Sequence, residues 1–190
     1  MTIRPATAAD AGALATCLLL AMEDIVYRLI GRRDLEAARQ FLQDLVRERG
    51  NQYSYENCWV LEADHEVQAA VNVYDGAALH ALRQPVKDLL RQRFGRDIHP
   101  EDETGPGEYY LDTLGVLPDQ QGRGLGTQLL QFIVAEFVQR RGGTLGLLVE
   151  EDNPDAKRLY LRIGFRVQGT RMLMGKRLEH LQLRPGHPGA

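Results

Sequence analysis

Apolar side chains in the first part of the chain recur at helical spacing. Residues 11–29 and 34–46 repeat them every three or four positions, which is the period of one face of an α-helix. Thr7 and Asp10 have the spacing of a capping box ahead of the first repeat, and Asp34 suits the N-cap of the second. The pattern predicts two consecutive helices near the N-terminus.

Shorter apolar runs, bounded by glycine, proline and acidic residues, are typical of strands. The predicted strands are 2–4, 58–63, 67–74, 109–116, 144–149, 165–167 and 171–178, the last two paired around Gly169. Helical repeats follow at 122–140 and 154–163, and a short helix is expected near 86–94. This mixed order predicts the α/β class, with hairpins in a partly antiparallel sheet.

The order of elements predicts a single domain over residues 1–183. Residues 77–107 break the regular pattern between the third and fourth strands and end in a long polar loop. A loop of this length in a compact domain is usually functional or mobile, so a substrate lid is one interpretation. Residues 184–190 are expected to form a flexible tail.

Composition and charge narrow the class of protein. Hydrophobic residues make up 44% and charged residues 26% of the chain, as in ordinary globular proteins. The net charge of −3 argues against a nucleic acid as the partner. Cys17 and Cys58 are expected to be buried free thiols, and the scattered histidines predict no metal site. No apolar stretch is long enough to span a membrane, so a cytoplasmic protein is expected.

The chemistry is expected at a glycine-rich turn, residues 121–126, that opens the helix after the strand at 109–116. Glycines let the backbone approach a ligand, and a helix N-terminus offers unpaired N–H groups to an anion. A dinucleotide is one candidate, because Gly122 and Gly124 match the start of its binding fingerprint. Thr127 occupies the position of the fingerprint's last glycine, which weakens the interpretation as an oxidoreductase.

Two segments together resemble the GNAT superfamily of acetyltransferases. Residues 121–126 resemble its Q/R-x-x-G-x-G/A signature, after a strand that ends in Leu-Gly-Val-x-Pro. Residues 153–165 are similar to its second cofactor segment, N-x-x-A-x-x-L-Y-x-x-x-G-F. The resemblance implies a GNAT-like mixed, largely antiparallel central sheet flanked by helices on both faces, and acetyl-coenzyme A as the co-substrate.

The resemblance also implies cofactor contacts residue by residue. The backbone N–H groups that would hold the pyrophosphate are those of Gln121, Gly122, Arg123, Gly124, Leu125 and Gly126. The Thr127 hydroxyl would add a hydrogen bond, and the backbone at Leu114 and Val116 would pair with the pantetheine arm. Asn153 would contact the cofactor as well, although a plain helix cap explains this asparagine equally.

Acetyl transfer from a thioester needs a neutral amine and a proton for the leaving thiolate. A lysine-like amine has a pKa of about 10.4, so only about one molecule in 2,500 is neutral at pH 7. Asp112 is the first candidate for the general base, and Glu108, on the same face of a regularly alternating strand, is the second. Tyr160 matches the family's general acid beside the cofactor, and a core tyrosine is the alternative interpretation.

The sequence therefore predicts an acetyl-coenzyme A-dependent N-acetyltransferase that uses no metal. A primary amine of a small molecule or peptide would attack directly in a ternary complex. Residues 22–27, 53–55 and 74–107 carry aromatic and acidic side chains that suit a cationic amine, although ordinary loops explain them too. A coenzyme A-binding regulatory domain without catalysis is the alternative, and a homodimer is left open.

Overall fold

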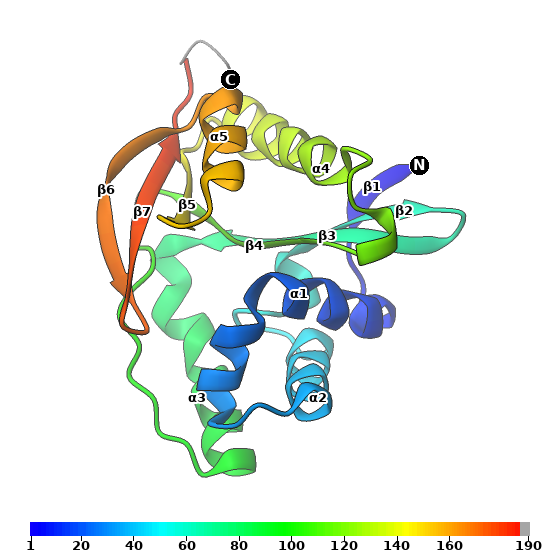
Figure 1. Ribbon diagram of the computed structural model, residues 1–190, viewed down its shortest axis with the longest axis vertical. Coiled ribbons are helices and arrows are strands. Elements are labelled where there is room, and N and C mark those ends of the chain that lie inside the picture. The colour runs from blue at the N-terminus through cyan, green and yellow to red at the C-terminus, as the bar shows by residue number, and fades with distance from the viewer. Residues whose placement is uncertain (187–190) are drawn as a thin grey trace. The chain divides into compact units, whose positions relative to one another are not determined.

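The computed structural model describes residues 1–186 and contains one seven-stranded sheet (Figure 1). The strands, in sheet order, are β1 (Thr2–Pro5), β2 (Cys58–Ala63), β3 (Glu66–Asp75), β4 (Tyr109–Val116), β5 (Leu145–Glu150), β7 (Lys176–Leu183) and β6 (Arg166–Leu173). The pairs β1–β2, β2–β3, β5–β7 and β6–β7 are antiparallel, whereas β4 and β5 run parallel. The predicted mixed, largely antiparallel sheet is confirmed.

The helices follow the predicted order. They are α1 (Ala11–Ile30), α2 (Leu35–Arg47), α3 (Leu79–Phe94), α4 (Leu125–Val134) and α5 (Pro154–Ile163). Gly31 ends α1 with a φ of 78°, and the Asp34 side chain accepts a 3.0 Å hydrogen bond from the N–H of Ala37 at the start of α2. Within residues 1–186, none of these helices combines the length and the apolar character needed to cross a membrane.

The chain divides into two compact units. The first unit consists of Met1–Val73, His80–His99 and Thr113–Leu129. The second unit consists of Tyr74–Leu79, Pro100–Asp112 and Leu130–Ala190. The single domain at 1–183, the insertion at 77–107 and the tail from residue 184 stay predictions, and residues 187–190 of that tail lie outside the described residues.

In the first unit, α1 packs against α2 and against the end of β4. A Cβ atom on Gly115 would lie 1.9 Å from the carbonyl oxygen of Cys17, so only glycine allows this approach. The Thr113 hydroxyl donates a 3.5 Å hydrogen bond to the sulfur of Met22, where α1 leaves helical geometry. Cys17 and Cys58 are buried free thiols, as predicted, and burial raises the pKa of Cys17 to about 12.

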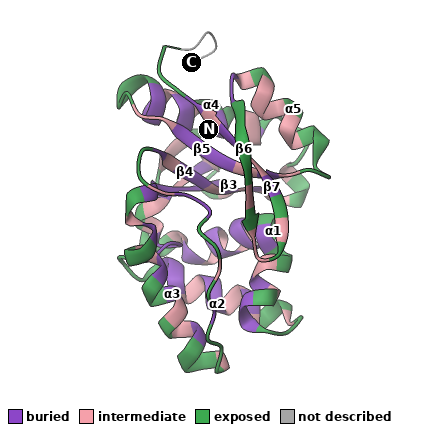
Figure 2. Ribbon diagram, turned by 90° about the vertical axis from the view of Figure 1, so that its left-hand side faces the viewer, coloured by how far each residue is buried: buried purple, intermediate pink, exposed green. Residues whose placement is uncertain are grey.

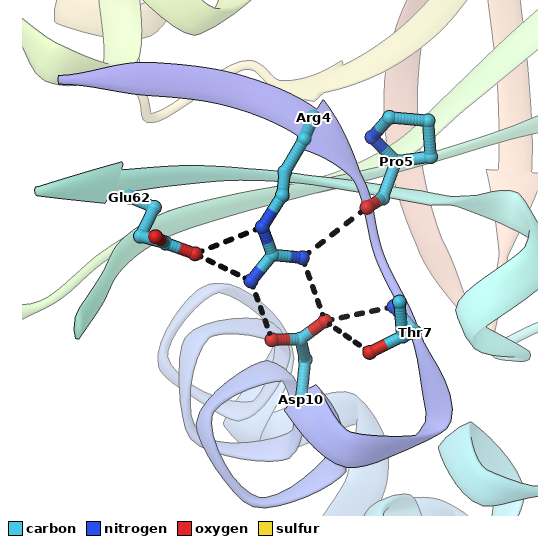
Figure 3. Close-up of polar contacts among 5 residues, drawn as sticks. All are labelled: Arg4, Pro5, Thr7, Asp10 and Glu62. Atoms are coloured by element: carbon cyan, nitrogen blue, oxygen red, sulfur yellow. Dashed lines mark hydrogen bonds and ion pairs between the residues drawn. The ribbon is translucent and has the colours of Figure 1, made fainter. Parts of the chain in front are cut away.

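An ion-pair network joins β1, β2 and the segment before α1 (Figure 3). The Arg4 guanidinium donates to Asp10 at 2.9 Å and to Glu62 at 2.6 Å. Asp10 also accepts a 2.7 Å hydrogen bond from the backbone N–H of Thr7, which completes the predicted capping box. The hydrogen bonds from Arg4, followed by those from Thr7, outweigh burial and lower the pKa of Asp10 to about 2.

In the second unit, β5 is largely buried between its neighbours, while the edge strand β6 is largely exposed (Figure 2). Lys157 of α5 pairs with Glu179 of β7 at 2.6 Å, which fixes α5 on the face of the strand that Glu179 occupies. His180, the next residue of β7, therefore lies on the opposite face. This division separates the side chains of the second unit into two sets.

Two predicted boundaries in the C-terminal half of the chain are wrong. The turn between β6 and β7 lies at Met174 and Gly175, with φ values of 50° and 75°, and not at Gly169. Gly169 lies instead beside a register shift within β6. The helix predicted from Gly122 starts at Leu125, and its last part, Ala135–Arg140, is a π-helix.

The helix predicted near 86–94 is also longer than expected, because α3 begins at Leu79. Asp75 caps the turn before it by accepting a 2.9 Å hydrogen bond from the N–H of Ala77. Pro85 lies inside the helix. A proline removes one backbone donor and disturbs the preceding turn, but here it does not end the helix.

Candidate active site

The glycine-rich turn lies in the first unit, between β4 and α4. Gly122 and Gly124 have φ values of 73° and 78°, in the left-handed region that side chains disfavour. Residues 121–124 are exposed, and helical geometry begins only at Leu125. The turn therefore presents its backbone to solvent directly before a helix N-terminus.

The backbone N–H groups of this turn are available for a ligand. The structure gives no acceptor, within the part of the chain it describes, to the N–H groups of Gly122, Arg123, Gly124, Leu125, Gly126 and Thr127. The first N–H that is satisfied belongs to Gln128, which donates to the carbonyl of Gly124 at 3.0 Å. Consecutive free N–H groups at the positive end of a helix dipole favour a bound anion.

The end of β4 is fitted closely to this turn. A Cβ atom on Gly126 would lie 3.4 Å from side-chain atoms of Leu114 and Val116, which is tight van der Waals contact. Gln121 donates a 3.1 Å hydrogen bond to the carbonyl of Val116. The parallel pairing of β4 with β5 ends at Leu111 and Leu147, although β4 continues to Val116. The last part of β4 therefore has backbone groups that β5 does not bind.

The second predicted segment begins at the N-terminus of α5. The Asn153 side chain accepts a 3.2 Å hydrogen bond from the N–H of Ala156, so the helix-cap interpretation is confirmed. Tyr160 is half-buried, and its ring lies 5.8 Å from that of Phe165 in an edge-on contact. Burial raises the pKa of the Tyr160 phenol. Its hydroxyl has no hydrogen-bond partner within residues 1–186.

Glu108 lies at the centre of a buried polar network in the second unit, with 6% of its surface exposed. Its carboxylate accepts hydrogen bonds from Thr104 at 2.8 Å, from Gln182 at 2.7 Å and from Nε2 of His180 at 2.9 Å. Burial raises the pKa of this carboxyl, but the three hydrogen bonds outweigh it and lower the pKa below its ordinary value. Glu108 is therefore ionised at neutral pH.

Side chains of β4 contact the helix that follows the strand. Leu114 and Val116 approach α4 at Gly126, while the Tyr109 ring packs 4.8 Å from Phe137 in the π-helix that continues α4. The prediction that Glu108 lies on the same face of the strand as Leu114 and Val116 stays a prediction. Asp112, the other candidate base, is half-buried.

Comparison with protein-family models identifies the family of the chain. The model of the acetyltransferase (GNAT) family matches residues 32–165 of the chain. This chain belongs to the GNAT family. The match includes both segments in which the sequence resembles the family's cofactor-binding motifs.

Individual GNAT relatives match shorter stretches. The N-alpha-acetyltransferase RimI of Mycobacterium tuberculosis is 44% identical over 68 residues, which cover 36% of this chain and 41% of that protein. A mycothiol acetyltransferase of Mycobacterium leprae is 47% identical over 66 residues, which cover 32% of this chain and 21% of that protein. The aligned stretches thus span less than half of these relatives.

Solved structures match almost the whole chain. An acetyltransferase crystal structure has a TM-score of 0.80 at 28% identity, covering 97% of this chain and 99% of the other. An acetyltransferase from Salmonella typhimurium, solved with its cofactor acetyl-CoA, has a TM-score of 0.54 at 20% identity, covering 100% of this chain and 96% of the other. The second likeness supports the GNAT fold alone.

Eight basic residues lie between positions 157 and 184 of this GNAT chain, and four of them form ion pairs. Lys157 pairs with Glu179 at 2.6 Å, Lys176 with Glu150 at 2.7 Å, Arg177 with Glu151 at 3.6 Å and Arg158 with Asp155. Because these cations are already paired, they are better explained as solvated faces than as a binding patch for a polyanion.

The sequence alone did not identify the partners of Glu108 in this GNAT chain. Thr104, His180 and Gln182 carry no motif, and His180 lies 72 positions from Glu108 along the chain. One signal is present at Gly146, because a Cβ atom there would lie 1.9 Å from the Glu108 carboxylate. A glycine in the middle of a predicted buried strand indicates close approach by another group.

Proposed function

We propose that the protein is an acetyl-coenzyme A-dependent N-acetyltransferase that acts on a primary amine of a small molecule or peptide. The observation that carries this proposal is the run of available backbone N–H groups from Gly122 to Thr127, in a member of the GNAT family. A diphosphate is the anion that such an arrangement suits best, because several N–H groups can bind several oxygens at once. Acetyl-coenzyme A supplies the activated acetyl thioester.

The cofactor-binding residues are proposed from the family resemblance and from the local geometry. The N–H groups of residues 122–126 hold the pyrophosphate, with the Thr127 hydroxyl at the first turn of α4. The N–H of Gln121, also expected to bind it, already donates to the carbonyl of Pro118 at 3.4 Å. The backbone of Leu114 and Val116 binds the pantetheine arm, using groups on the side of β4 that β5 leaves unpaired. Asn153 binds the cofactor through the part of its amide that does not cap α5.

Tyr160 is proposed as the general acid that protonates the leaving sulfur. Its raised pKa keeps the phenol protonated at neutral pH, so the hydroxyl holds the proton that it must donate. Its hydroxyl is not engaged by another residue of the described chain. A thiol has a pKa of about 8.5, so a single donor is sufficient to assist its departure.

A general base must remove a proton from the acceptor ammonium. Asp112 and Glu108 are the candidates from the sequence. Glu108 is ionised but already accepts three hydrogen bonds, which leaves little capacity for a substrate proton. Asp112 is half-buried on β4, and its assignment stays a proposal.

The class of acceptor follows from the names of the relatives and from the acidic residues near Glu108. RimI is named as an N-alpha-acetyltransferase and the other relative as a mycothiol acetyltransferase, so both a peptide and a small molecule remain in the proposal. Glu101, Asp102 and Glu103 precede Glu108 in the second unit and place negative charge there. An acidic environment favours a cationic amine.

The proposal is tested by binding and by turnover. Thermal-shift measurements compare acetyl-coenzyme A with NAD and NADP, and thiol release is then followed with a panel of primary amines and N-terminal peptides. Stabilisation by acetyl-coenzyme A and amine-dependent thiol release are expected, with initial rates that show a ternary complex. Stabilisation by a nicotinamide cofactor alone would contradict the proposal. Acetyl-coenzyme A binding without thiol release for any amine would favour the non-catalytic regulatory domain.

A further inference from the structure

The proposed cofactor site makes no use of the buried network around Glu108. Polar groups of this kind are costly to bury, because they lose their hydration. His180 has only 8% of its surface exposed, and Nε2 lies 2.9 Å and 3.2 Å from the two carboxylate oxygens of Glu108. A buried histidine and carboxylate that are held in contact this way can move protons as well as join strands.

The hydrogen bonds define which nitrogen of His180 carries a proton. Glu108 is ionised, so its carboxylate can only accept, and Nε2 must donate. In the neutral imidazole, Nδ1 is then the unprotonated nitrogen with a free lone pair. The structure gives Nδ1 no hydrogen bond to any described residue. Glu108 thus fixes both the orientation and the tautomer of the ring.

The position of His180 in the sheet suits a role in the reaction. The last parallel pair of β4 and β5 is Leu111 with Leu147, and His180 lies opposite Leu148, one residue further along β5. His180 therefore stands at the level where the pairing of β4 with β5 stops. It also lies on the face opposite Glu179, which is bound by α5, the helix that carries Tyr160.

We propose that His180 is the general base that deprotonates the acceptor amine through Nδ1, and that Glu108 is its positioning residue. This inference rests on the proposed acetyltransferase function and deepens it. Glu108, a candidate for the general base from the sequence, then acts only indirectly, by orienting His180. It also places the base and the helix that carries Tyr160 on opposite faces of the second unit's strands. The amine and the cofactor thiol can then approach from different sides.

The proton balance of the step is complete with these residues. The acceptor ammonium loses one proton to Nδ1 of His180, which passes it to solvent, and the freed lone pair forms the C–N bond. The C–S bond breaks, and Tyr160 gives its proton to the sulfur. The nitrogen loses its second proton through solvent, and that proton restores the Tyr160 phenol. The net result is an amide, a free thiol and one proton released.

Other charged groups of the second unit also lie near this face. On β6, Arg166 and Arg171 stand opposite Gln182 and Leu178, on either side of the residue paired with His180. Arg166 donates to the carbonyl of Phe165 and Arg171 to that of Asp102, both at 3.3 Å. β5 presents Gly146, Leu148 and Glu150 on this face, and Glu150 pairs with Lys176 of β7 at 2.7 Å.

The segment before β4 also carries Glu101, Asp102 and Glu103, and each of them has partners. Glu101 accepts a 2.9 Å hydrogen bond from the N–H of Met174, and Glu103 accepts one of 3.0 Å from the Tyr74 hydroxyl. Glu108 is thus the carboxylate that contacts the imidazole of His180 directly. The proposal concerns this pair, and the other groups set the background charge for any pH profile.

The kinetic test compares His180→Gln with the wild-type protein at saturating acetyl-coenzyme A and amine. For an aliphatic amine, kcat should fall about 10²-fold at pH 7 and recover toward the wild-type value near pH 10, where the amine loses its own proton. For an amine with a pKa below 7, which needs no base, the loss should be much smaller. His65→Asn, at an exposed turn residue, is the matched control and should leave both rates unchanged.

Glu108→Gln tests the positioning role, with an expected loss of roughly tenfold to a hundredfold in kcat and little change in the KM for acetyl-coenzyme A. Equal losses of His180→Gln for both classes of amine would indicate a structural role and overturn the inference. A wild-type pH profile in His180→Gln would also overturn it. In both cases amine-dependent thiol release by the wild-type protein would leave the proposed function intact.

Nitrogen NMR of the imidazole rings gives a measurement that needs no turnover. His180, assigned by comparison with His180→Gln, should show Nε2 protonated and Nδ1 unprotonated in its neutral form, and Glu108→Gln should mix the two tautomers. A neutral ring with its proton on Nδ1 would overturn the inference. If no amine supports thiol release, the proposed function fails. The tautomer measured by NMR then still tests whether Glu108 positions the His180 ring.

Discussion

The glycine-rich turn of the first unit and the Glu108 network of the second unit are built in opposite ways. The turn and the start of α4 form one continuous segment, and the groups it offers are the backbone N–H groups of residues 122–127. The network draws its side chains from β7 and from the segment before β4, and His180 lies 72 positions from Glu108. The first site is exposed, whereas the second is buried.

This difference separates what each site can do. Backbone N–H groups keep their position whichever side chains surround them, so the turn suits the binding of an invariant group such as a pyrophosphate. Side chains with perturbed pKa values suit proton transfer, but each depends on several partners that must all be in place. We therefore expect the turn to control affinity and the buried side chains to control turnover.

The largest effect is expected from Tyr160→Phe, which separates turnover from affinity. Removing the hydroxyl should lower kcat about 10²-fold, because the sulfur then leaves without a positioned proton donor. The Kd for acetyl-coenzyme A should change less than about threefold, since the turn is untouched. A thiol-release assay measures kcat, and isothermal titration calorimetry measures the Kd. A kcat within twofold of wild type would remove Tyr160 from the mechanism.

The second prediction concerns the glycine that makes room for Glu108. In Gly146→Ala the new methyl group would lie 1.9 Å from a carboxylate oxygen that three donors hold in place. The free energy of unfolding should fall by about 2 kcal/mol, as for other overpacked cores. Gly105→Ala, at a position with open space and no positive φ, is the control.

A double variant shows whether the loss of stability in Gly146→Ala comes from the contact with the Glu108 carboxylate. In a Glu108→Ala background, Gly146→Ala should cost much less, because the carboxylate that it would meet is gone. Chemical denaturation of the four proteins gives the coupling free energy. Additive losses would mean that the strain at Gly146 has another source.

The same contrast explains how much could be predicted from the sequence. Features set by neighbouring residues were predicted correctly, as with the N-caps Asp34 and Asn153 and the strand Tyr109–Val116. The β6–β7 turn was misplaced because Met174, a residue that seldom adopts a positive φ, occupies it together with Gly175. The Glu108 network could not be predicted, because its members come together only through the pairing of β5 with both β4 and β7.

The third prediction tests the backbone site alone. Gly124→Ala keeps every chemical group of the turn but places a side chain at a φ of 78°, which costs about 1 kcal/mol. Relaxation of the turn should weaken acetyl-coenzyme A binding roughly fivefold to tenfold and leave kcat at saturation nearly unchanged. Gly169→Ala is the matched control, at an exposed position with a negative or extended φ. An unchanged Kd would argue that the pyrophosphate binds elsewhere.

The smallest effect is expected at Asp10. This residue tests whether a carboxyl group with a lowered pKa must also have a role in turnover. Asp10 and Glu108 both have pKa values below the ordinary range, but Asp10 pairs with Arg4 and caps the segment before α1. Its pKa falls from 3.8 to about 2 on folding, so its contribution to stability is complete above about pH 4 and is lost as the pH falls toward 2. Water around the half-exposed Arg4 guanidinium limits this contribution to about 1 kcal/mol.

Asp10→Asn should therefore lower the free energy of unfolding by about 1 kcal/mol at pH 7 and flatten its dependence on pH between 4 and 2. Asp64→Asn, at an exposed turn where asparagine is tolerated, serves as the control. Because Asp10 touches neither the glycine-rich turn nor the Glu108 network, kcat should stay at the wild-type value. A fall in kcat as large as that of Glu108→Gln would show that a lowered carboxyl pKa marks neither site, and that only the contact with His180 distinguishes Glu108.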